Sequence, residues 1–266
     1  MLTKRLIACF DIISGMVTKA VQFQDNIEVA AAESLAKTMY DSQIDELIFY
    51  DVTASNEKRK IDIETVKKVA ACVFIPFTVG GGIKGLDDMY EALKAGAEKI
   101  SIDSMAVRNP QIIADGAKAF GSQCIVLSTQ VRRVPVSAKI PSGYEVFIDG
   151  ARVATGMDAI EWIKRGQELG AGELCLNSID NDGTLGGYDL ELMKLASKAV
   201  SIPLIASGGA GAPEHLSKLF TETASQAAII SSMLYSPRMA RNYSVKELKE
   251  YLTEQNINVR PYKIQN

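Results

Sequence analysis

The stretch IPFTVGGG, residues 75–82, recurs later in the chain as IPLIASGG, residues 202–209. A second pair, IDEL at 44–47 and AGEL at 171–174, is separated by the same number of positions. Both copies of the first stretch are short apolar runs that end in glycines, which is typical of a buried strand followed by a tight turn. The repeat predicts a chain built from two fused copies, in which each half supplies matching chemical groups.

Apolar runs of strand length alternate along the chain with amphipathic helical patterns. We expect strands near residues 5–11, 45–51, 75–79, 98–103, 123–129, 172–177, 202–206 and 226–232. Helices are expected at 30–42, 60–71, 86–95, 110–119, 158–169, 188–199, 213–222 and 244–254. Eight strands, each followed by a helix, predict parallel α/β units that close into one (β/α)8 TIM barrel, residues 1–266. The repeat divides this single domain into two half-barrels, roughly 1–122 and 123–254.

The composition excludes several classes of protein. Hydrophobic residues make up 47% and charged residues 23% of the 266 residues, as in an ordinary globular protein. A net charge of −3 with no block of Lys or Arg gives no reason to expect nucleic-acid binding. The longest apolar runs have the length of strands, so we expect no membrane span. The first residues, MLTKRLIACFDII, look like a short signal peptide, but Asp11 interrupts the apolar run.

The cysteines and the histidine limit the possible metal chemistry. Four cysteines have no CxxC spacing, and we expect them to be reduced and mostly buried. The chain has one histidine, His215, which excludes a multi-histidine metal site. We therefore expect no metal, no cofactor and a cytoplasmic protein.

Two segments are longer than a barrel needs. Residues 13–29 are expected to form a long loop after the first strand. Residues 131–153 alternate polar and apolar residues around Ser-Gly, which predicts a β-hairpin lid after the fifth strand. Catalytic residues gather at the carboxyl ends of barrel strands, so long connections at that end are usually functional.

Glycines and serines at matching places in the two halves predict two phosphate sites. Backbone N–H groups at such glycines approach an anion closely. The candidates for binding phosphate are Gly81, Gly82 and Ser104 in the first half, and Gly208, Gly209, Ser231 and Ser232 in the second. Either glycine cluster alone is as well explained by a tight turn, but two at matching positions indicate a ligand with a phosphate at each end. Asp103 lies beside the first site, where a carboxylate repels phosphate unless it is protonated; alternatively it points elsewhere and only backbone groups touch the phosphate.

Carboxylates at strand ends are candidates for acid–base chemistry between the two phosphates. Asp11, Asp51 and Asp180 end strands, and Asp182 follows in the next loop together with Gly183. Asp11 is the strongest candidate, because burying a charged group at the end of an apolar strand is costly. The alternative is a structural, salt-bridged aspartate.

Charged residues also occur at the opposite ends of the strands. Arg5, Glu46, Lys99 and Glu173 lie at strand starts and would form a charged ring around the bottom opening of the barrel. On the residues alone, a structural salt-bridge network is the favoured interpretation, because this face normally serves stability.

Together these residues resemble the cyclase subunit of imidazole glycerol phosphate synthase, a family of histidine biosynthesis. The resemblance covers essentially the whole chain. Its carriers are KRLIACFD at 4–11, DELIFYDVTAS at 45–55, FTVGGGI at 77–83, FGSQ at 120–123, GAGE at 170–173, SIDNDGT at 178–184, IASGGAG at 205–211 and ELKEYL with NVR between 247 and 260.

The resemblance implies a bis-phosphorylated aminoimidazole carboxamide ribonucleotide as substrate, in agreement with two phosphate sites. It also implies that ammonia arrives from a glutaminase partner on the bottom face and passes through the barrel. The charged ring then corresponds to the gate for ammonia. In the family the catalytic groups are two aspartates, at the ends of strands one and five. Asp11 matches the first, and Lys19 matches a mobile lysine of the first loop.

The chain departs from the family pattern at the second aspartate, where it has Gln130. A glutamine forms hydrogen bonds with a substrate but exchanges no proton near neutral pH. Other departures cluster at the same face: Met16 for arginine, Ala20 for glycine, Asp103 for asparagine and Ser104 for threonine. These changes indicate a weakened cyclase, an altered substrate or an evolved variant.

Three functions follow from these observations. The first is an ammonia-dependent cyclase and lyase in which Asp11 is the acid–base group and Gln130 positions the substrate. The second is a related ammonia-channelling subunit that serves the amidation of a surface-glycan sugar. The third is a non-catalytic barrel that binds bis-phosphates.

Overall fold

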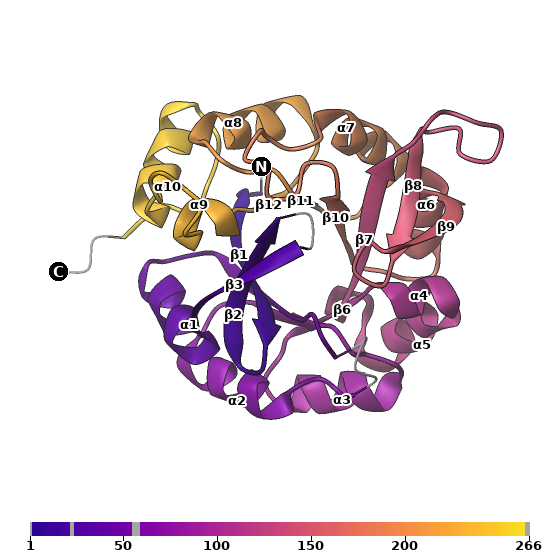
Figure 1. Ribbon diagram of the computed structural model, residues 1–266, viewed down its shortest axis with the longest axis horizontal. Helices are drawn as coiled ribbons and strands as arrows, with labels where there is room; N and C mark the ends of the chain where they lie inside the picture. The colour runs from indigo at the N-terminus through magenta and orange to yellow at the C-terminus, as the bar shows by residue number, and fades with distance from the viewer. Residues whose placement is uncertain (1, 22–23, 55–58, 264–266) are drawn as a thin grey trace.

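Eight parallel strands form a closed barrel at the centre of the structure (Figure 1). The computed structural model describes residues 2–21, 24–54 and 59–263. In order around the barrel, the strands are β1 (Arg5–Ile13), β4 (Glu46–Asp51), β5 (Phe77–Gly80), β6 (Lys99–Ile102), β7 (Ile125–Arg133), β10 (Glu173–Ser178), β11 (Leu204–Ser207) and β12 (Ala227–Ile229). The sheet closes because β1 pairs with both β4 and β12, and β7 pairs with β10. The predicted (β/α)8 barrel is confirmed.

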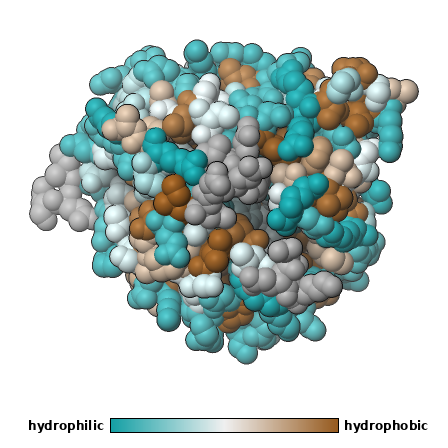
Figure 2. Space-filling model, viewed as in Figure 1, coloured by the Kyte–Doolittle hydropathy of each residue, from teal (hydrophilic) through white to brown (hydrophobic). Residues whose placement is uncertain are grey.

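A ring of helices surrounds the barrel (Figure 1). The longer helices are α1 (Ala32–Asp41), α2 (Ile63–Cys72), α3 (Leu86–Lys94), α5 (Gln111–Phe120), α6 (Ala159–Glu168), α7 (Leu190–Ala199), α8 (Pro213–Glu222) and α10 (Val245–Glu254). Their apolar residues recur every three or four positions, so one face packs on the sheet. Figure 2 shows hydrophilic side chains around the rim, where the outer faces of these helices meet solvent.

Three short helical segments were not expected from the sequence. They are α4 (Ser104–Arg108), the 3₁₀ turn η1 (Ser122–Cys124) and α9 (Ser231–Tyr235). Both α4 and α9 begin within two residues of a barrel strand end. They therefore place Ser104 and Ser231 at the carboxyl ends of β6 and β12.

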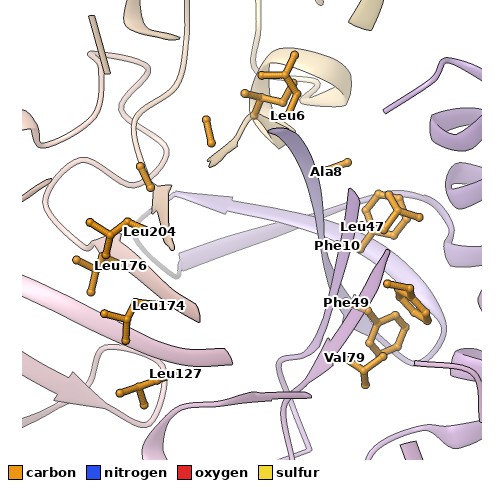
Figure 3. Close-up of a cluster of buried hydrophobic side chains, with 14 of the residues drawn as sticks. Leu6, Ala8, Phe10, Leu47, Phe49, Val79, Leu127, Leu174, Leu176 and Leu204 are labelled. Carbon is orange, nitrogen blue, oxygen red and sulfur yellow. The ribbon is translucent and has the colours of Figure 1, made fainter. Parts of the chain in front are cut away.

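The core has two layers because alternate residues of a strand face opposite sides of the sheet. Leu6, Ala8 and Phe10 of β1 pack outward against the helices, in the large cluster shown in Figure 3. Ile7 and Cys9 of the same strand belong to a smaller cluster of buried residues with Ile48, Val126, Cys175, Ile205, Ala227 and Ile229. This second cluster contains the inward-facing residues, so it fills the interior of the barrel.

The expectation of a loop at residues 13–29 is wrong. β1 continues to Ile13, turns at Ser14 and Gly15, and is followed by β2 (Met16–Val21) and β3 (Gln24–Ala31). β2 pairs antiparallel with the end of β1, and β3 with β2. Both lie over the centre of the ring in Figure 1. Backbone pairing along β1 thus forms two strands that the sequence pattern did not predict. Residues 22–23 lie outside the described part.

The hairpin expected at 131–153 exists with different bounds. β7 runs to Arg133 and pairs antiparallel with β8 (Tyr144–Ile148), which in turn pairs with β9 (Val153–Asp158). Ser142 and Gly143 lie directly before β8, in the first of two connections. The role of a lid stays a prediction.

Within residues 2–21, 24–54 and 59–263, no helix combines the length and apolar character needed to cross a membrane.

Candidate active site

Asp11 and Lys19 come together at the mouth of the barrel, the face formed by the carboxyl ends of its strands. Asp11 lies on β1, and the antiparallel pairing of β2 brings Lys19 Nζ within 3.4 Å of Asp11 Oδ2. Lys19 is buried, and its ammonium group lies 5.4 Å from the centre of the Tyr235 ring. Burial alone would lower the pKa of Lys19, but Tyr235 and Asp11 outweigh it and raise the pKa. Lys19 is therefore a cation fixed beside the Asp11 carboxylate.

Asp182 interacts electrostatically with both Asp11 and Lys19. Burial, followed by the negative charge of Asp11, raises the pKa of Asp182 to about 6, while Lys19 acts in the opposite direction. Its loop is held by a backbone hydrogen bond from Asp182 N to Ser178 O at 3.0 Å. Asp182 is thus a carboxyl with a raised pKa beside the pair of Asp11 and Lys19.

Gln130 lies in a chain of polar side chains that crosses three strands. The Asn177 side-chain amide, on β10, donates to Gln130 Oε1 at 2.9 Å. Gln130 Nε2 in turn donates to Asp103 Oδ2 at 3.5 Å. Asn177 was missed by the sequence reasoning, because an asparagine at the end of a strand gives no signal by itself. The chain fixes the orientation of the amide that stands in place of the expected aspartate.

Asp51 and Asp180, two of the candidate carboxylates, are engaged in structural contacts. Arg59 forms a two-pronged ion pair with Asp51, at 2.5 and 2.7 Å, and the N–H groups of Ala54 and Asp62 also donate to it. Asp180 accepts a hydrogen bond from the N–H of Arg133 at 2.8 Å. We assign both to the loops that they hold, and not to the chemistry.

The glycine turns after β5 and β11 are tight. Gly81 and Gly209 have positive φ, and a Cβ on either would overlap a carbonyl oxygen, that of Asp51 or Gly187. Turn geometry alone therefore demands glycine at both positions. Gly82, Gly183 and Gly208 also have positive φ, so both halves of the chain turn sharply at the mouth.

The serines of the two halves differ in the use of their hydroxyl groups. Ser231 Oγ donates to the carbonyl of Cys9 at 2.9 Å and accepts from its N–H at 2.7 Å. Its hydrogen is therefore committed, which argues against the expected donation to a phosphate. Ser104 Oγ accepts from the N–H of Asp149 at 2.9 Å, and its own hydrogen has no acceptor among the residues that the structure describes.

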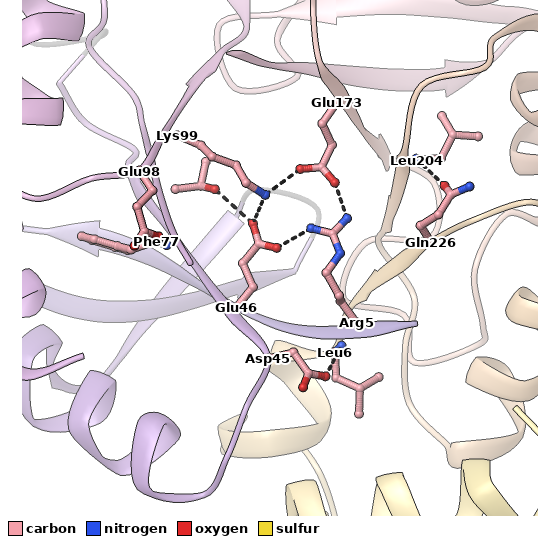
Figure 4. Close-up of polar contacts among 11 residues, drawn as sticks. Arg5, Leu6, Asp45, Glu46, Phe77, Glu98, Lys99, Glu173, Leu204 and Gln226 are labelled. Atoms are coloured by element: carbon pink, nitrogen blue, oxygen red, sulfur yellow. Dashed lines mark hydrogen bonds and ion pairs between the residues drawn. The ribbon is translucent and has the colours of Figure 1, made fainter. Parts of the chain in front are cut away.

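The four predicted charges at the bottom form a closed ring (Figure 4). Lys99 Nζ contacts Glu46 Oε1 at 2.7 Å and Glu173 Oε2 at 2.8 Å. Arg5 contacts Glu46 at 2.5 Å and also Glu173. Thr78 Oγ1 donates to Glu46 Oε1 at 3.2 Å. Each charge thus contacts two of opposite sign, so the four formal charges of the ring cancel.

Small and mostly apolar side chains separate the ring from the mouth. Cys9 and Cys175 face this interior, and burial raises the pKa of Cys175 to about 12. Both thiols are therefore neutral. The Tyr50 hydroxyl lies 3.0 Å from Ser101 Oγ, so its polar group has a partner inside the barrel. Among the described residues, no cluster of His, Cys, Asp or Glu could hold a metal ion.

Comparison with known proteins gives a consistent result. The family model described as "Histidine biosynthesis protein" matches residues 5–240. The chain is 50% identical over 260 residues to the "Imidazole glycerol phosphate synthase subunit HisF" of Desulfatibacillum aliphaticivorans, covering 98% of both chains. Proteins of the same name from Desulfosudis oleivorans and Desulforapulum autotrophicum are 49% and 50% identical, over 98% of this chain and 99% of theirs. The chain therefore belongs to the histidine biosynthesis protein family.

Proposed function

We propose that the chain is the ammonia-dependent cyclase of histidine biosynthesis. In this reaction a bis-phosphorylated aminoimidazole carboxamide ribonucleotide gives imidazole glycerol phosphate and the aminoimidazole carboxamide ribonucleotide. The observation that carries the proposal is the near-full-length similarity to synthase subunits, at about half identity. Glycan amidation and a non-catalytic barrel are not favoured, because these relatives carry the synthase name over almost their whole length.

In this proposal Asp11 accepts and returns protons at the substrate. Lys19 holds the side chain of Asp11 in place, because the two groups form an ion pair at 3.4 Å. Gln130, held by Asn177, positions the substrate through its amide. The two phosphates bind at the glycine turns of the two halves. The groups assigned to them are Gly81, Gly82 and Ser104 on one side, and Gly183, Gly208, Gly209 and Ser232 on the other.

The proposal includes a glutaminase subunit on the bottom face as the source of ammonia. The charged ring of Arg5, Glu46, Lys99 and Glu173 is its gate into the barrel; this assignment is supported by the ion pairs that join the four side chains at the strand starts. We also propose a cytoplasmic location, which suits four free cysteines. The division into half-barrels at residues 1–122 and 123–254 belongs to the same proposal.

The function is tested by turnover of the purified chain with the ribonucleotide and ammonium chloride. Both products are expected to accumulate in equal amounts, and no cofactor needs to be added. If neither product forms at any ammonium concentration while the protein is folded, the proposal is wrong.

Lys99→Met tests the gate separately from the chemistry. The variant removes the cation that contacts both Glu46 and Glu173, and it leaves two buried carboxylates with one partner fewer. We expect turnover with ammonium chloride to stay close to the unmodified value, because the mouth is unchanged. Turnover with glutamine and the glutaminase subunit is expected to change several-fold. Equal effects on both reactions would show that the ring is only structural.

A further inference from the structure

We propose that Asp103 provides the proton-donating carboxyl of the reaction, with Asp11 as the partner that accepts a proton. This inference rests on the proposed function. It answers the question raised by Gln130, an amide that exchanges no proton near neutral pH. This side of the barrel mouth still has a carboxyl group, because Asp103 lies beside Gln130.

The position of Asp103 follows from the sheet. It comes directly after Ile102, the last residue of β6, and β6 pairs with β7, which carries Gln130. Gln130 Nε2 lies 3.5 Å from Asp103 Oδ2. Because Asn177 donates to Gln130 Oε1, the amide is held with its NH₂ group toward Asp103. Asp103 Oδ2 therefore accepts a hydrogen bond from a neutral amide, which neither gives up nor takes a proton.

The other carboxyl oxygen has no partner in the described part of the chain. Asp103 Oδ1 is buried and forms no hydrogen bond within residues 2–21, 24–54 and 59–263. Buried polar atoms of folded proteins almost always have a partner, and an exception calls for an explanation. A carboxyl that holds its proton on this oxygen would have an O–H group without an acceptor among the described residues.

Burial, more than the neighbouring charges, favours the protonated form of Asp103. Burial raises the pKa of Asp103 to about 7, against the opposing hydrogen bond from Gln130. The carboxylate of Asp149, in the connection between β8 and β9, raises it further, while Arg108 of α4 lowers it. Asp149 and Arg108 pair with each other at 2.5 Å, so their effects largely cancel. Asp11, by contrast, lies 3.4 Å from the ammonium group of Lys19.

Two carboxyl groups in different protonation states are a common arrangement for acid and base roles. When ammonia condenses with a carbonyl group and water leaves, the nitrogen loses two protons and the oxygen gains two. As the C–N bond forms, Asp103 gives its proton to the oxygen and Asp11 takes one from the nitrogen. Exchange with solvent returns both carboxyl groups to their starting states. The same two transfers then repeat, so that the C–O bond breaks with release of water and a C=N bond forms.

Asp103→Asn tests the proposal with little change in shape. We expect kcat with ammonium chloride to fall by about 10²–10⁴-fold, the usual contribution of a general acid. In the unmodified protein kcat falls as pH rises through about 7, because Asp103 loses its proton, and this decline should vanish in the variant. Free ammonia is held constant at each pH. Adding Gln130→Asp to Asp103→Asn returns a carboxyl group to this side and is expected to recover part of kcat.

Asp149→Asn is the matched second variant, since it leaves Asp103 in place. Removing the nearby negative charge lowers the pKa of Asp103, so the decline of kcat should move to lower pH with the maximal value retained. The pKa of Asp182 is also raised, to about 6, but by burial and the charge of Asp11, so a shift caused by Asp149→Asn identifies Asp103. If Asp103→Asn keeps kcat within twofold, or if the decline stays in place in Asp149→Asn, the inference is overturned. No turnover by the unmodified chain would overturn the proposed function, and the inference with it.

Discussion

Replacing Asp11 by asparagine is expected to reduce kcat with ammonium chloride by about 10²–10⁴-fold or more, with little change in KM. The amide has nearly the same shape but cannot accept a proton at neutral pH. Lys19 would lose the anion that lies 3.4 Å from its Nζ and would become a buried cation with one partner fewer. Steady-state kinetics at saturating ammonia measure both parameters.

The same variant has a second, independent signature at Asp182. The negative charge of Asp11 helps to raise the pKa of Asp182 to about 6, so its removal should lower that pKa. Titration of the Asp182 carboxyl by NMR in both proteins would show the shift. An Asp11→Asn protein with full kcat would remove Asp11 from the chemistry, whatever happens at Asp182.

Lys249→Ala is expected to cause the largest loss of stability, about 3–5 kcal/mol in the free energy of unfolding. Lys249 lies on α10 and is 2% exposed; its Nζ contacts Asp45 Oδ1 at 2.7 Å and the carbonyl of Gln43 at 2.8 Å. Asp45 Oδ2 accepts from the N–H of Leu6 (Figure 4). The lysine thus joins the last helix to β1, and its loss leaves a buried carboxylate without its cation.

Denaturant unfolding followed by circular dichroism measures this loss. Lys246→Ala on the same helix is the control, because the ion pair of Lys246 with Glu250 is exposed and spans 3.8 Å. Such surface pairs contribute about 0–1 kcal/mol. Pairing Lys249→Met with Asp45→Asn removes both charges and should recover part of the stability. Equal effects of Lys249→Ala and Lys246→Ala would contradict the role assigned to the buried pair.

The barrel could be predicted from the sequence because its strands are nearly continuous apolar runs between amphipathic helices. Each of these patterns is local, and the repeat of residues 75–82 at 202–209 fixes the number of units. The pairing of β2 with β1 could not be predicted in this way. This pairing depends on β1 continuing two residues past Asp11. In the sequence, only Ser14 and Gly15 indicate the turn that brings β2 back along β1.

The candidate site also contains residues that local sequence patterns could place and residues that they could not. The charges of the bottom ring and Asp11 could be placed from strand ends, where the side-chain direction follows from the strand period. Lys19 was expected in a loop, and its contact with Asp11 depends on the pairing of β2 with β1. The chain from Asp103 through Gln130 to Asn177 joins three strands that are distant in sequence. Its geometry depends on the stagger of the closed barrel, which a single sequence does not reveal.

The central claim is that this chain forms the imidazole product from ammonia by its own residues. The most direct test supplies ¹⁵N-labelled ammonium chloride with the bis-phosphorylated ribonucleotide and analyses both products by mass spectrometry. We predict one labelled nitrogen in imidazole glycerol phosphate and none in the released aminoimidazole carboxamide ribonucleotide, in equal amounts. An unlabelled imidazole product, or no product from folded protein, would contradict the claim.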